Sequence, residues 1–392
     1  MKKFVKSVAV IAALTFVFAA CEQTAIGSAG DFPLGAASLN AVKGVSVPPS
    51  VWKPLSPSLL PFPNSGVNMV RGLASDGRYM VAVGTIPNGN SYATRYDYTN
   101  TSWSTPVPLP DIPSGVNVGA VHYLNGYYLA TGGSTSQRGD YSSDLGASWA
   151  MTGGIGFGTK AGVYGEDEEL YVVAGQNGQA AYTGNLGNNF NVIGPAITGW
   201  TTGTGSDLYI NAGAYGTNGE GDGRYVFGGG SGRIAWTESI LSGGQPVTWT
   251  TATATTGNWP FGPGDFVNVI AYGNGVFVAV GNIAANTQGI VAYSSDGEHW
   301  TGVTLSTLPP LFGRTSGIYA LAFGNGYFAA ADNDGNFVYS ANGSTWTAAS
   351  GVVFGNNSRV NAITYLSGDE GELDHFFVGG GDSGGVQAGD SN

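Results

Sequence analysis

A serine, an acid and a histidine stand within six positions in the segment 292–303, whose sequence is AYSSDGEHWTGV. Ser294, Asp296 and His299 are the residue types of a nucleophilic triad, in which histidine takes the serine proton and an acid orients the histidine. The same serine and acid, followed by Gly297, are also residues that shape tight turns. Recurrence of the segment along the chain decides between these two interpretations.

Close variants of this segment recur at 140–149 (DYSSDLGASW), 181–190 (AYTGNLGNNF) and 338–346 (VYSANGSTW). Asp and Asn side chains can accept hydrogen bonds from nearby backbone N–H groups, and glycine takes the positive φ. The closing aromatic can bury on the order of 150–250 Å² between neighbouring sheets. Because a motif in several copies is a fold element, we predict structural roles for Ser142, Asp144, Gly146, Trp149, Asn185, Phe190, Ser294, Asp296, Gly297, Trp300, Ser340, Asn342, Gly343 and Trp346.

A repeat of strand, glycine-bearing turn and strand precedes these motifs. It occurs seven times, at 66–84, 115–133, 158–175, 207–230, 266–282, 317–333 and 359–381. The spacing of successive closing aromatics resembles the roughly 40–50 residues of a four-stranded propeller blade. We therefore predict an all-β, seven-bladed β-propeller of four-stranded blades over residues 48–392. The segment at about 48–56, with Trp52 in the aromatic position, is predicted to complete the last blade and close the ring. A pair of β-sandwiches would not explain a seven-fold period.

The motif Ser-x-Asp-x-Gly-x-x-Trp at 142–149 resembles the Asp-box, or BNR repeat, of sialidases and sortilin-type receptors. The resemblance implies a secreted β-propeller and is weak evidence for any activity. A sialidase would need three arginines that clamp a carboxylate, a Tyr–Glu nucleophile pair and an acid. Arg138, Arg314 and Arg359 could form such a triad, whereas Arg71 and the remaining arginines fall in or beside predicted strands. No Glu with a Tyr partner occupies a comparable loop, so a glycan-directed hydrolase is the alternative function, not the preferred one.

The charge composition narrows the choice of partners. Only 10% of residues are charged, against roughly 25% in ordinary soluble domains, and the formal net charge is −12. No basic cluster lies outside the extreme N-terminus, which argues against nucleic acid as a partner. The three histidines and the acidic turns form no metal pattern. We expect neither a metal nor a cofactor.

The first twenty residues are typical of a secretory signal peptide. Lys2, Lys3 and Lys6 precede an apolar run too short for a membrane span. The run ends in FAAC, which resembles a bacterial lipobox with Phe18 in place of the usual leucine. Cys21, the only cysteine, is therefore predicted to carry lipid such as palmitate, with 21–47 as a tether. This places the chain in a bacterial envelope, in the periplasm or on the outer membrane surface; an ordinary cleaved signal is the alternative.

Candidate ligand-binding residues lie in the loops predicted for the face opposite the turn motifs. The preferred function is non-catalytic: binding a glycan, peptide or envelope protein over the channel, or serving as a scaffold. Asn68, Asn117, Asn268 and Asn361 recur after a branched apolar residue and could ring the channel mouth or cap exposed backbone. The aromatic candidates could bind a ligand or cap blade ends. The loop candidates are Trp200, Trp259, Phe261, Phe312, Arg138, Arg314 and Arg359.

Overall fold

The structure is a computed structural model in which the described residues all belong to the compact unit Leu39–Asn392. The described residues are 52–54, 70–85, 90–97, 102–112, 118–132, 138–193, 197, 200, 205–242, 244–255, 259–350, 360–366, 375–380 and 388–391. The predicted signal peptide, tether and Cys21 lie outside them. Across these ranges, no helix is long and apolar enough to cross a membrane.

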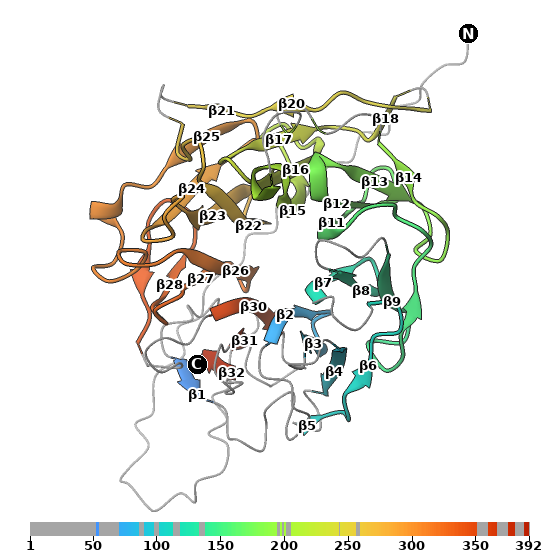
Figure 1. Cartoon of the computed structure of the whole chain (residues 1–392). Coiled ribbons are helices and arrows are strands. Elements are labelled where there is room, and N and C mark those ends of the chain that lie inside the picture. The colour runs from blue at the N-terminus through green and yellow to red at the C-terminus, as the bar shows by residue number, and fades with distance from the viewer. Residues whose placement is uncertain are drawn as a thin grey trace, which may run out of the picture. The chain divides into compact units, whose positions relative to one another are not determined.

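The chain forms an all-β propeller of four-stranded antiparallel blades arranged around a central axis (Figure 1). The innermost strands are β2 (Val70–Ser75), β7 (Val118–Leu124), β11 (Thr159–Gly165), β15 (Ile210–Thr217), β22 (Phe266–Gly273), β26 (Ile318–Gly324) and β30 (Val360–Leu366). The second strands are β3 (Tyr79–Thr85), β8 (Tyr127–Gly132), β12 (Leu170–Gly175), β16 (Gly223–Gly229), β23 (Val276–Asn282), β27 (Tyr327–Asp332) and β31 (His375–Gly380).

The outer half of each sheet is shorter and more irregular than the inner half. The third strands are β4 (Ser91–Asp97), β9 (Gly139–Ser142), β13 (Ala180–Thr183), β17 (Ile234–Thr237), β24 (Gly289–Ser294), β28 (Phe337–Ser340) and β32 (Ala388–Ser391). The fourth strands are β5 (Ser102–Trp103), β10 (Ala150–Met151), β14 (Asn191–Val192), β20 (Thr250–Thr251), β25 (His299–Gly302), β29 (Thr347–Ala348) and β1 (Trp52–Pro54). The additional short elements are β6 (Val107–Pro108), β18 (Leu241–Ser242), β19 (Gln245–Pro246), β21 (Thr253–Ala254), η2 (Gln176–Gly178), η3 (Gly205–Leu208) and η4 (Leu305–Thr307).

The hairpins between first and second strands follow from their turn residues. Asn274 and Gly275 both have positive φ, 50° and 74°, as do the Asn-Gly pairs at 125–126 and 325–326. Two central residues with positive φ give the turn whose twist matches the flanking strands. The six second strands whose side chains are described are buried almost throughout, as in β23, because their blades lie between two neighbouring blades. The cores therefore lie between blades, where Trp300 and Trp346 are 0% and 5% exposed.

The repeat predicts seven blades, but only six blades have described side chains in all four strands. In the remaining sheet, whose order is β1-β32-β31-β30, side chains are described only for β30. The number of blades with a described core is therefore corrected from seven to six. In this sheet Trp52 of β1 is paired with Ser391 of β32, as predicted for the N-terminal strand. Strand β30 lies beside β2, where the Asn361 side-chain amide donates to the Val70 carbonyl at 2.8 Å.

The blade that ends at Trp249 lacks the turn motif and has a hairpin, β18–β19, in its place. The backbone N–H of Ile240 donates to a carboxylate oxygen of Glu168 at 2.8 Å, and the Ser239 hydroxyl donates to the other oxygen at 2.7 Å. Glu168 belongs to the turn between β11 and β12 of the preceding blade. A carboxylate from a neighbouring blade therefore takes over the fastening role of the missing motif.

Candidate functional site at the channel mouth

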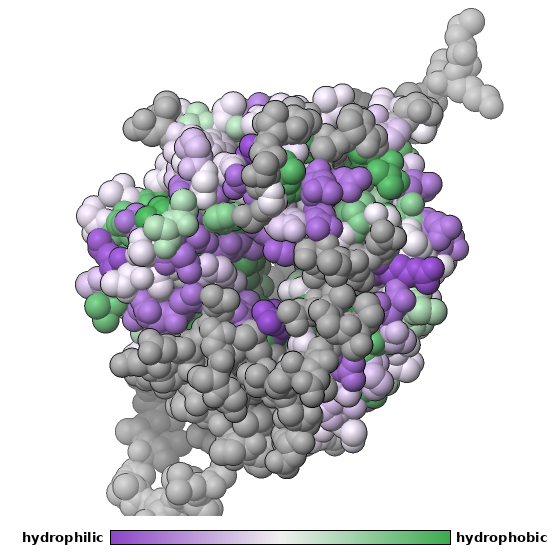
Figure 2. Space-filling view, in the orientation of Figure 1, coloured by the Kyte–Doolittle hydropathy of each residue, from purple (hydrophilic) through white to green (hydrophobic). Residues whose placement is uncertain are grey.

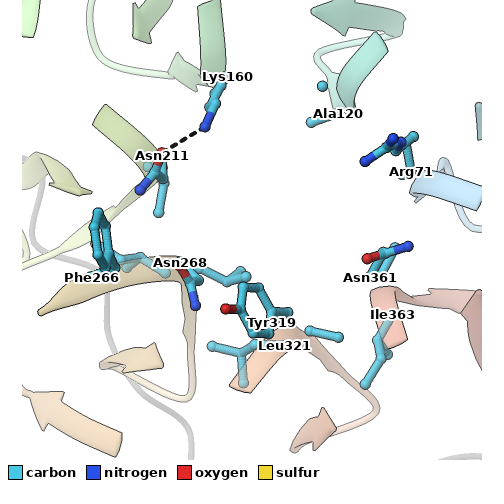
Figure 3. Close-up of a pocket in the computed structure, with 18 of the residues that line it drawn as sticks. Arg71, Ala120, Lys160, Asn211, Phe266, Asn268, Tyr319, Leu321, Asn361 and Ile363 are labelled. Carbon is cyan, nitrogen blue, oxygen red and sulfur yellow. Dashed lines mark hydrogen bonds between the residues drawn. The ribbon is translucent and has the colours of Figure 1, made fainter. Parts of the chain in front are cut away.

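Every innermost strand carries a β-bulge near its start. One residue of the innermost strand has no partner on the second strand, although the residues before and after it are paired. In β22 this residue is Asn268, between Val267 and Val269. A bulge bends the strand and re-aims the extra side chain. All of the bulged residues line one cavity of about 710 Å³ in the channel (Figure 3). We call this set the bulge ring: Arg71, Gly119, Lys160, Asn211, Asn268, Tyr319 and Asn361.

The residues on either side of each bulge anchor it. In β26, Ile318 is 0% exposed and Ala320 is 1% exposed, while Tyr319 between them faces the cavity. The same order of a buried β-branched residue, a variable residue and a small or branched apolar residue holds in the other innermost strands. The fold therefore fixes the backbone of the bulge ring and leaves the side-chain chemistry free to vary.

Three amides of the bulge ring join neighbouring blades. Asn361 donates to the Val70 carbonyl at 2.8 Å, Asn268 donates to the Ile318 carbonyl at 3.0 Å, and Asn211 donates to the Val267 carbonyl at 3.4 Å. Each bond reaches from one innermost strand to the next. The amide N–H groups of these side chains therefore bond to backbone carbonyls, and the same side chains line the cavity at the channel mouth.

Two cations belong to the bulge ring. The Lys160 ammonium donates to Asn211 Oδ1 at 3.1 Å and lies 4.9 Å from the centroid of the Tyr209 ring, and burial lowers its pKa. Arg71 extends into the cavity from another side (Figure 3). Among the described residues that line the cavity, none is Asp or Glu. The described wall of this cavity is therefore cationic, in a chain of formal net charge −12.

His122 lies deeper in the channel, next to Lys160. Its Nε2 is 3.2 Å from the Lys160 carbonyl oxygen. Burial lowers the pKa of His122 to about 4, an effect only partly offset by this hydrogen bond. The imidazole is therefore neutral at pH 7, and Nε2 carries the proton that it donates to the carbonyl.

A second cavity, of about 690 Å³, continues the channel past His122. It is lined at the far ends of the innermost strands by Tyr123, Tyr164, Tyr215 and Tyr272, together with the exposed Glu166 and Glu169. We call this end the acidic mouth and the bulge-ring end the cationic mouth. Hydrophilic residues border the central hollow on the face shown in Figure 2.

The aromatic residues at the acidic mouth pack on glycines of the preceding blade. A Cβ added to Gly216 would lie 2.3 Å from the Tyr272 ring, and one on Gly273 would lie 2.2 Å from the Phe323 ring. Tyr272 also shares a 2.6 Å hydrogen bond with the Thr217 hydroxyl. The aromatics therefore contribute mainly to contacts between blades.

The predicted loop aromatics do not line either cavity. Trp200, Phe261 and Phe312 are each 1% exposed and belong to the cores between blades. Trp259 is half-buried and donates its indole N–H to the Gly232 carbonyl at 2.8 Å. Blade-end capping, the alternative weighed for these side chains, matches their described surroundings.

The predicted arginines are not brought together at the channel. Arg138 is exposed and lies 3.9 Å from a carboxylate oxygen of Asp111. Arg314 is also exposed and donates to the Leu305 carbonyl at 2.6 Å. Neither lines the cationic mouth, and Arg359 lies outside the described residues.

The structure describes two of the four amides predicted at the channel mouth. Asn268 and Asn361 belong to the bulge ring, whereas Asn68 and Asn117 lie outside the described residues. The bulged residues of β2 and β7 are instead Arg71 and Gly119. The Val-Asn pair does not locate the bulged residue in these two strands. The bulged residue directly follows the first buried β-branched residue of the strand, here Val70 and Val118. Counting from that residue would also have found Lys160, Asn211 and Tyr319.

Ser294 and Asp296 accept hydrogen bonds within the turn that contains them and His299. The Gly297 N–H donates to Ser294 Oγ at 2.8 Å, and the His299 N–H donates to Asp296 Oδ1 at 2.8 Å. Burial opposes ionisation of Asp296, but the hydrogen bonds from His299 and its neighbours lower the pKa to about 2. Equivalent bonds occur in two other turns, where the Gly146 N–H donates to Ser142 Oγ at 2.8 Å and the Gly343 N–H donates to Ser340 Oγ at 2.9 Å. The serine accepts a backbone N–H in each turn, and the histidine has no counterpart in the other two.

Glycoside hydrolysis generally requires two carboxyl groups that flank the scissile bond, roughly 5–9.5 Å apart. The described lining of the cationic mouth contains no carboxyl group, and that of the acidic mouth contains the exposed Glu166 and Glu169. The three arginines named for a carboxylate clamp are likewise not assembled there. The described geometry therefore offers binding groups at the cationic mouth and no pair of carboxyl groups beside them.

Comparison with solved structures finds other β-propellers. YCF48 bound to D1 peptide superposes with a TM-score of 0.54 at 15% identity, over 90% of this chain and 99% of that chain. YCF48 from Cyanidioschyzon merolae gives a TM-score of 0.55 at 15% identity, over 87% and 98% of the two chains. The WD40 repeats of RRP9 give 0.58 at 9% identity, over 87% and 97%. Identities this low show a shared fold alone. No protein-family model and no curated protein sequence matches the chain.

Proposed function

We propose that this propeller is a non-catalytic binding protein that holds a peptide segment of a partner protein at its cationic mouth. The observation that carries the proposal is the bulge ring, which directs polar and charged side chains from six strands into one cavity, with Gly119 at the seventh position. Its volume of about 710 Å³ falls within the range of ligand sites. A similar propeller, YCF48, has been solved with a bound peptide, which supports a peptide as the ligand class.

The bulge ring offers a steric test that removes no existing contact. Gly119 has no side chain, and an added Cβ would lie 3.5 Å from the Thr131 carbonyl oxygen, an ordinary contact distance. Gly119→Trp should therefore place an indole in the cavity without disturbing the fold. Gly184→Trp is the matched control, because Gly184 is exposed and an added Cβ meets nothing within 4 Å.

The experiment is selection of peptides from a random displayed library on the purified wild-type protein, followed by affinity measurement on both variants. We expect Gly119→Trp to abolish binding of the selected peptides and Gly184→Trp to retain it, with both variants melting close to wild type. Selected peptides that bind Gly119→Trp and wild type equally would contradict the proposed site.

We further propose that the sheet β1-β32-β31-β30 is the seventh blade and that the turn motifs belong to the Asp-box type. The pairing of Trp52 with Ser391 supports closure of the ring by the N-terminal strand. Deletion of 22–44 should leave cooperative unfolding intact, whereas deletion of 22–56 should abolish it. Equal melting curves for the two truncations would contradict ring closure.

The same proposal includes a lipid anchor on Cys21 and a position in a bacterial envelope, supported by the N-terminal sequence. Cys21→Ser should release the protein from membranes and prevent incorporation of labelled palmitate in a bacterial host. A Cys21→Ser variant that remained membrane-attached would overturn the anchor without affecting the peptide site.

A further inference from the structure

We infer that the peptide presents a carboxylate to Lys160 and Arg71, so that the cationic mouth selects acidic segments. This inference rests on the proposed function and names the ligand group that the site recognises. It depends on three observations: the surroundings of Lys160, the charge of the described cavity wall, and the difference between the two mouths.

The first observation is that Lys160 is half-buried without a described carboxylate partner. Its ammonium donates to the neutral Asn211 amide and lies against the Tyr209 ring. An ammonium removed from water costs free energy unless an opposite charge compensates it. Retention of this cation inside a cavity is explained if a bound anion supplies the compensation.

The second observation is that Lys160 is held in place before any ligand arrives. Asn211 accepts from the ammonium through Oδ1 while its amide N–H group donates to the Val267 carbonyl. The bulge in β11 fixes the lysine backbone, and the His122 imidazole is hydrogen-bonded to the Lys160 carbonyl. A cation positioned in this way loses little conformational freedom on binding, which favours affinity.

The third observation is the contrast in charge along the channel. Arg71 and Lys160 enter the cationic mouth from different sides (Figure 3). Glu166 and Glu169 stand at the acidic mouth. An anionic segment is attracted at one mouth and repelled at the other, so electrostatics would direct it to the bulge ring.

A side-chain carboxylate and a C-terminal carboxylate have the same chemistry, and the probes must distinguish them. We would use four fluorescein-labelled probes in anisotropy titrations: an amidated hexaglutamate, an amidated hexaglutamine, a hexaglycine with a free carboxyl terminus, and tetragalacturonate as an acidic glycan. The protein variants are wild type, Lys160→Met, Lys160→Arg and Gly119→Trp. Lys160→Met keeps a long flexible side chain and removes the ammonium together with its hydrogen bond to Asn211.

The expected result is that hexaglutamate, hexaglycine carboxylate or both bind wild type at least about tenfold more tightly than hexaglutamine. Lys160→Met should remove that preference, Lys160→Arg should retain much of it, and raised salt should weaken it. Lys160→Met should melt no lower than wild type, since it loses an uncompensated cation. Preference for one of the two acidic peptides identifies the source of the carboxylate.

Other results would overturn the inference. Equal affinity of wild type and Lys160→Met for the acidic peptides, together with loss of peptide binding in Gly119→Trp, would reject the carboxylate and leave the peptide site standing. Binding of tetragalacturonate without any peptide binding would replace the peptide by an acidic glycan. Peptide binding unaffected by Gly119→Trp would reject the site itself.

Discussion

The two mouths of the channel are built from the same seven strands but use their side chains differently. At the acidic mouth, Tyr272 and Phe323 pack on glycines of the preceding blade, and Glu168 fastens a neighbouring hairpin. At the cationic mouth, the amides reach neighbouring strands while Lys160 and Arg71 extend into a cavity. Side chains at the acidic mouth mainly hold blades together, whereas the cationic mouth leaves two charged side chains lining an open cavity.

The largest expected loss of stability comes from adding a side chain to a glycine on which an aromatic ring packs at the acidic mouth. Gly273→Ala places a Cβ about where the Phe323 ring already lies, at 2.2 Å. Such overpacking should lower the free energy of unfolding by about 3 kcal/mol, measured by urea denaturation. Gly119→Ala at the cationic mouth is the matched control and should stay within about 0.5 kcal/mol of wild type. Comparable losses in both variants would remove the distinction between the mouths.

Removal of the Glu168 carboxylate should have the next largest effect. Glu168→Ala leaves the N–H of the fully buried Ile240 without its acceptor, whereas the Ser239 hydroxyl can still donate to the Leu241 carbonyl. We expect a loss of about 2 kcal/mol in unfolding free energy. Glu166→Ala at the same turn is the control, because Glu166 is exposed, and it should be close to neutral. A neutral Glu168→Ala would show that the hairpin does not depend on the neighbouring blade.

His122 lines both cavities and should make stability depend on pH. Its folded-state pKa of about 4 is below the ordinary histidine value of 6.5, so the unfolded chain binds the proton more readily. The contribution is present above about pH 6.5 and is lost as pH falls toward 4. Between pH 7 and pH 5 the loss attributable to His122 is roughly 2 kcal/mol.

The measurement is the difference in unfolding free energy between wild type and His122→Gln across this pH range. Wild type should lose more stability than the variant on acidification, and taking the difference cancels the titration of other groups. Parallel pH profiles for the two proteins would show that burial does not suppress protonation of His122.

The smallest effect is expected in the turn that first suggested catalysis. Asp296→Asn keeps an oxygen that can accept the backbone N–H groups, as Asn342 does in the equivalent turn. The free energy of unfolding should fall by no more than about 1 kcal/mol, because the variant loses the carboxylate's contact with the exposed His299. Loss of the bound peptide in this variant would move the functional surface to the face of the turn motifs.

The all-β architecture and the hairpin turns could be predicted from the sequence because their signals are local. Asn274 and Gly275 form the turn that their residue types favour, and Ser294 and Asp296 bond within a few positions. The bulge ring could not be found in this way, because a bulge is defined by pairing with another strand. Arg71 was set aside as a strand residue, although the bulge is what turns it into the cavity.

The loop aromatics show a different limit of sequence analysis, which concerns side chains whose burial is decided by distant segments. Trp200 and Phe312 lie in segments of irregular sequence, which left ligand binding and blade-end capping as alternatives, and each is 1% exposed in the structure. Both side chains belong to the hydrophobic cores between blades. Sequence pattern indicates that an aromatic is available, but packing of distant segments decides whether it is accessible.

The most direct test of the cationic mouth uses the scarcity of lysine. Beyond the predicted signal peptide, the chain contains only Lys43, Lys53 and Lys160. Reductive methylation with ¹³C-formaldehyde would give each lysine a dimethylammonium NMR signal, and Lys160→Met would assign the third. On titration with amidated hexaglutamate or hexaglycine carboxylate, the signal of Lys160 should shift in a saturable manner while those of Lys43 and Lys53 stay constant. A Lys160 signal that does not move, or that moves only in step with the other two, would contradict the assignment of the cationic mouth as the binding site.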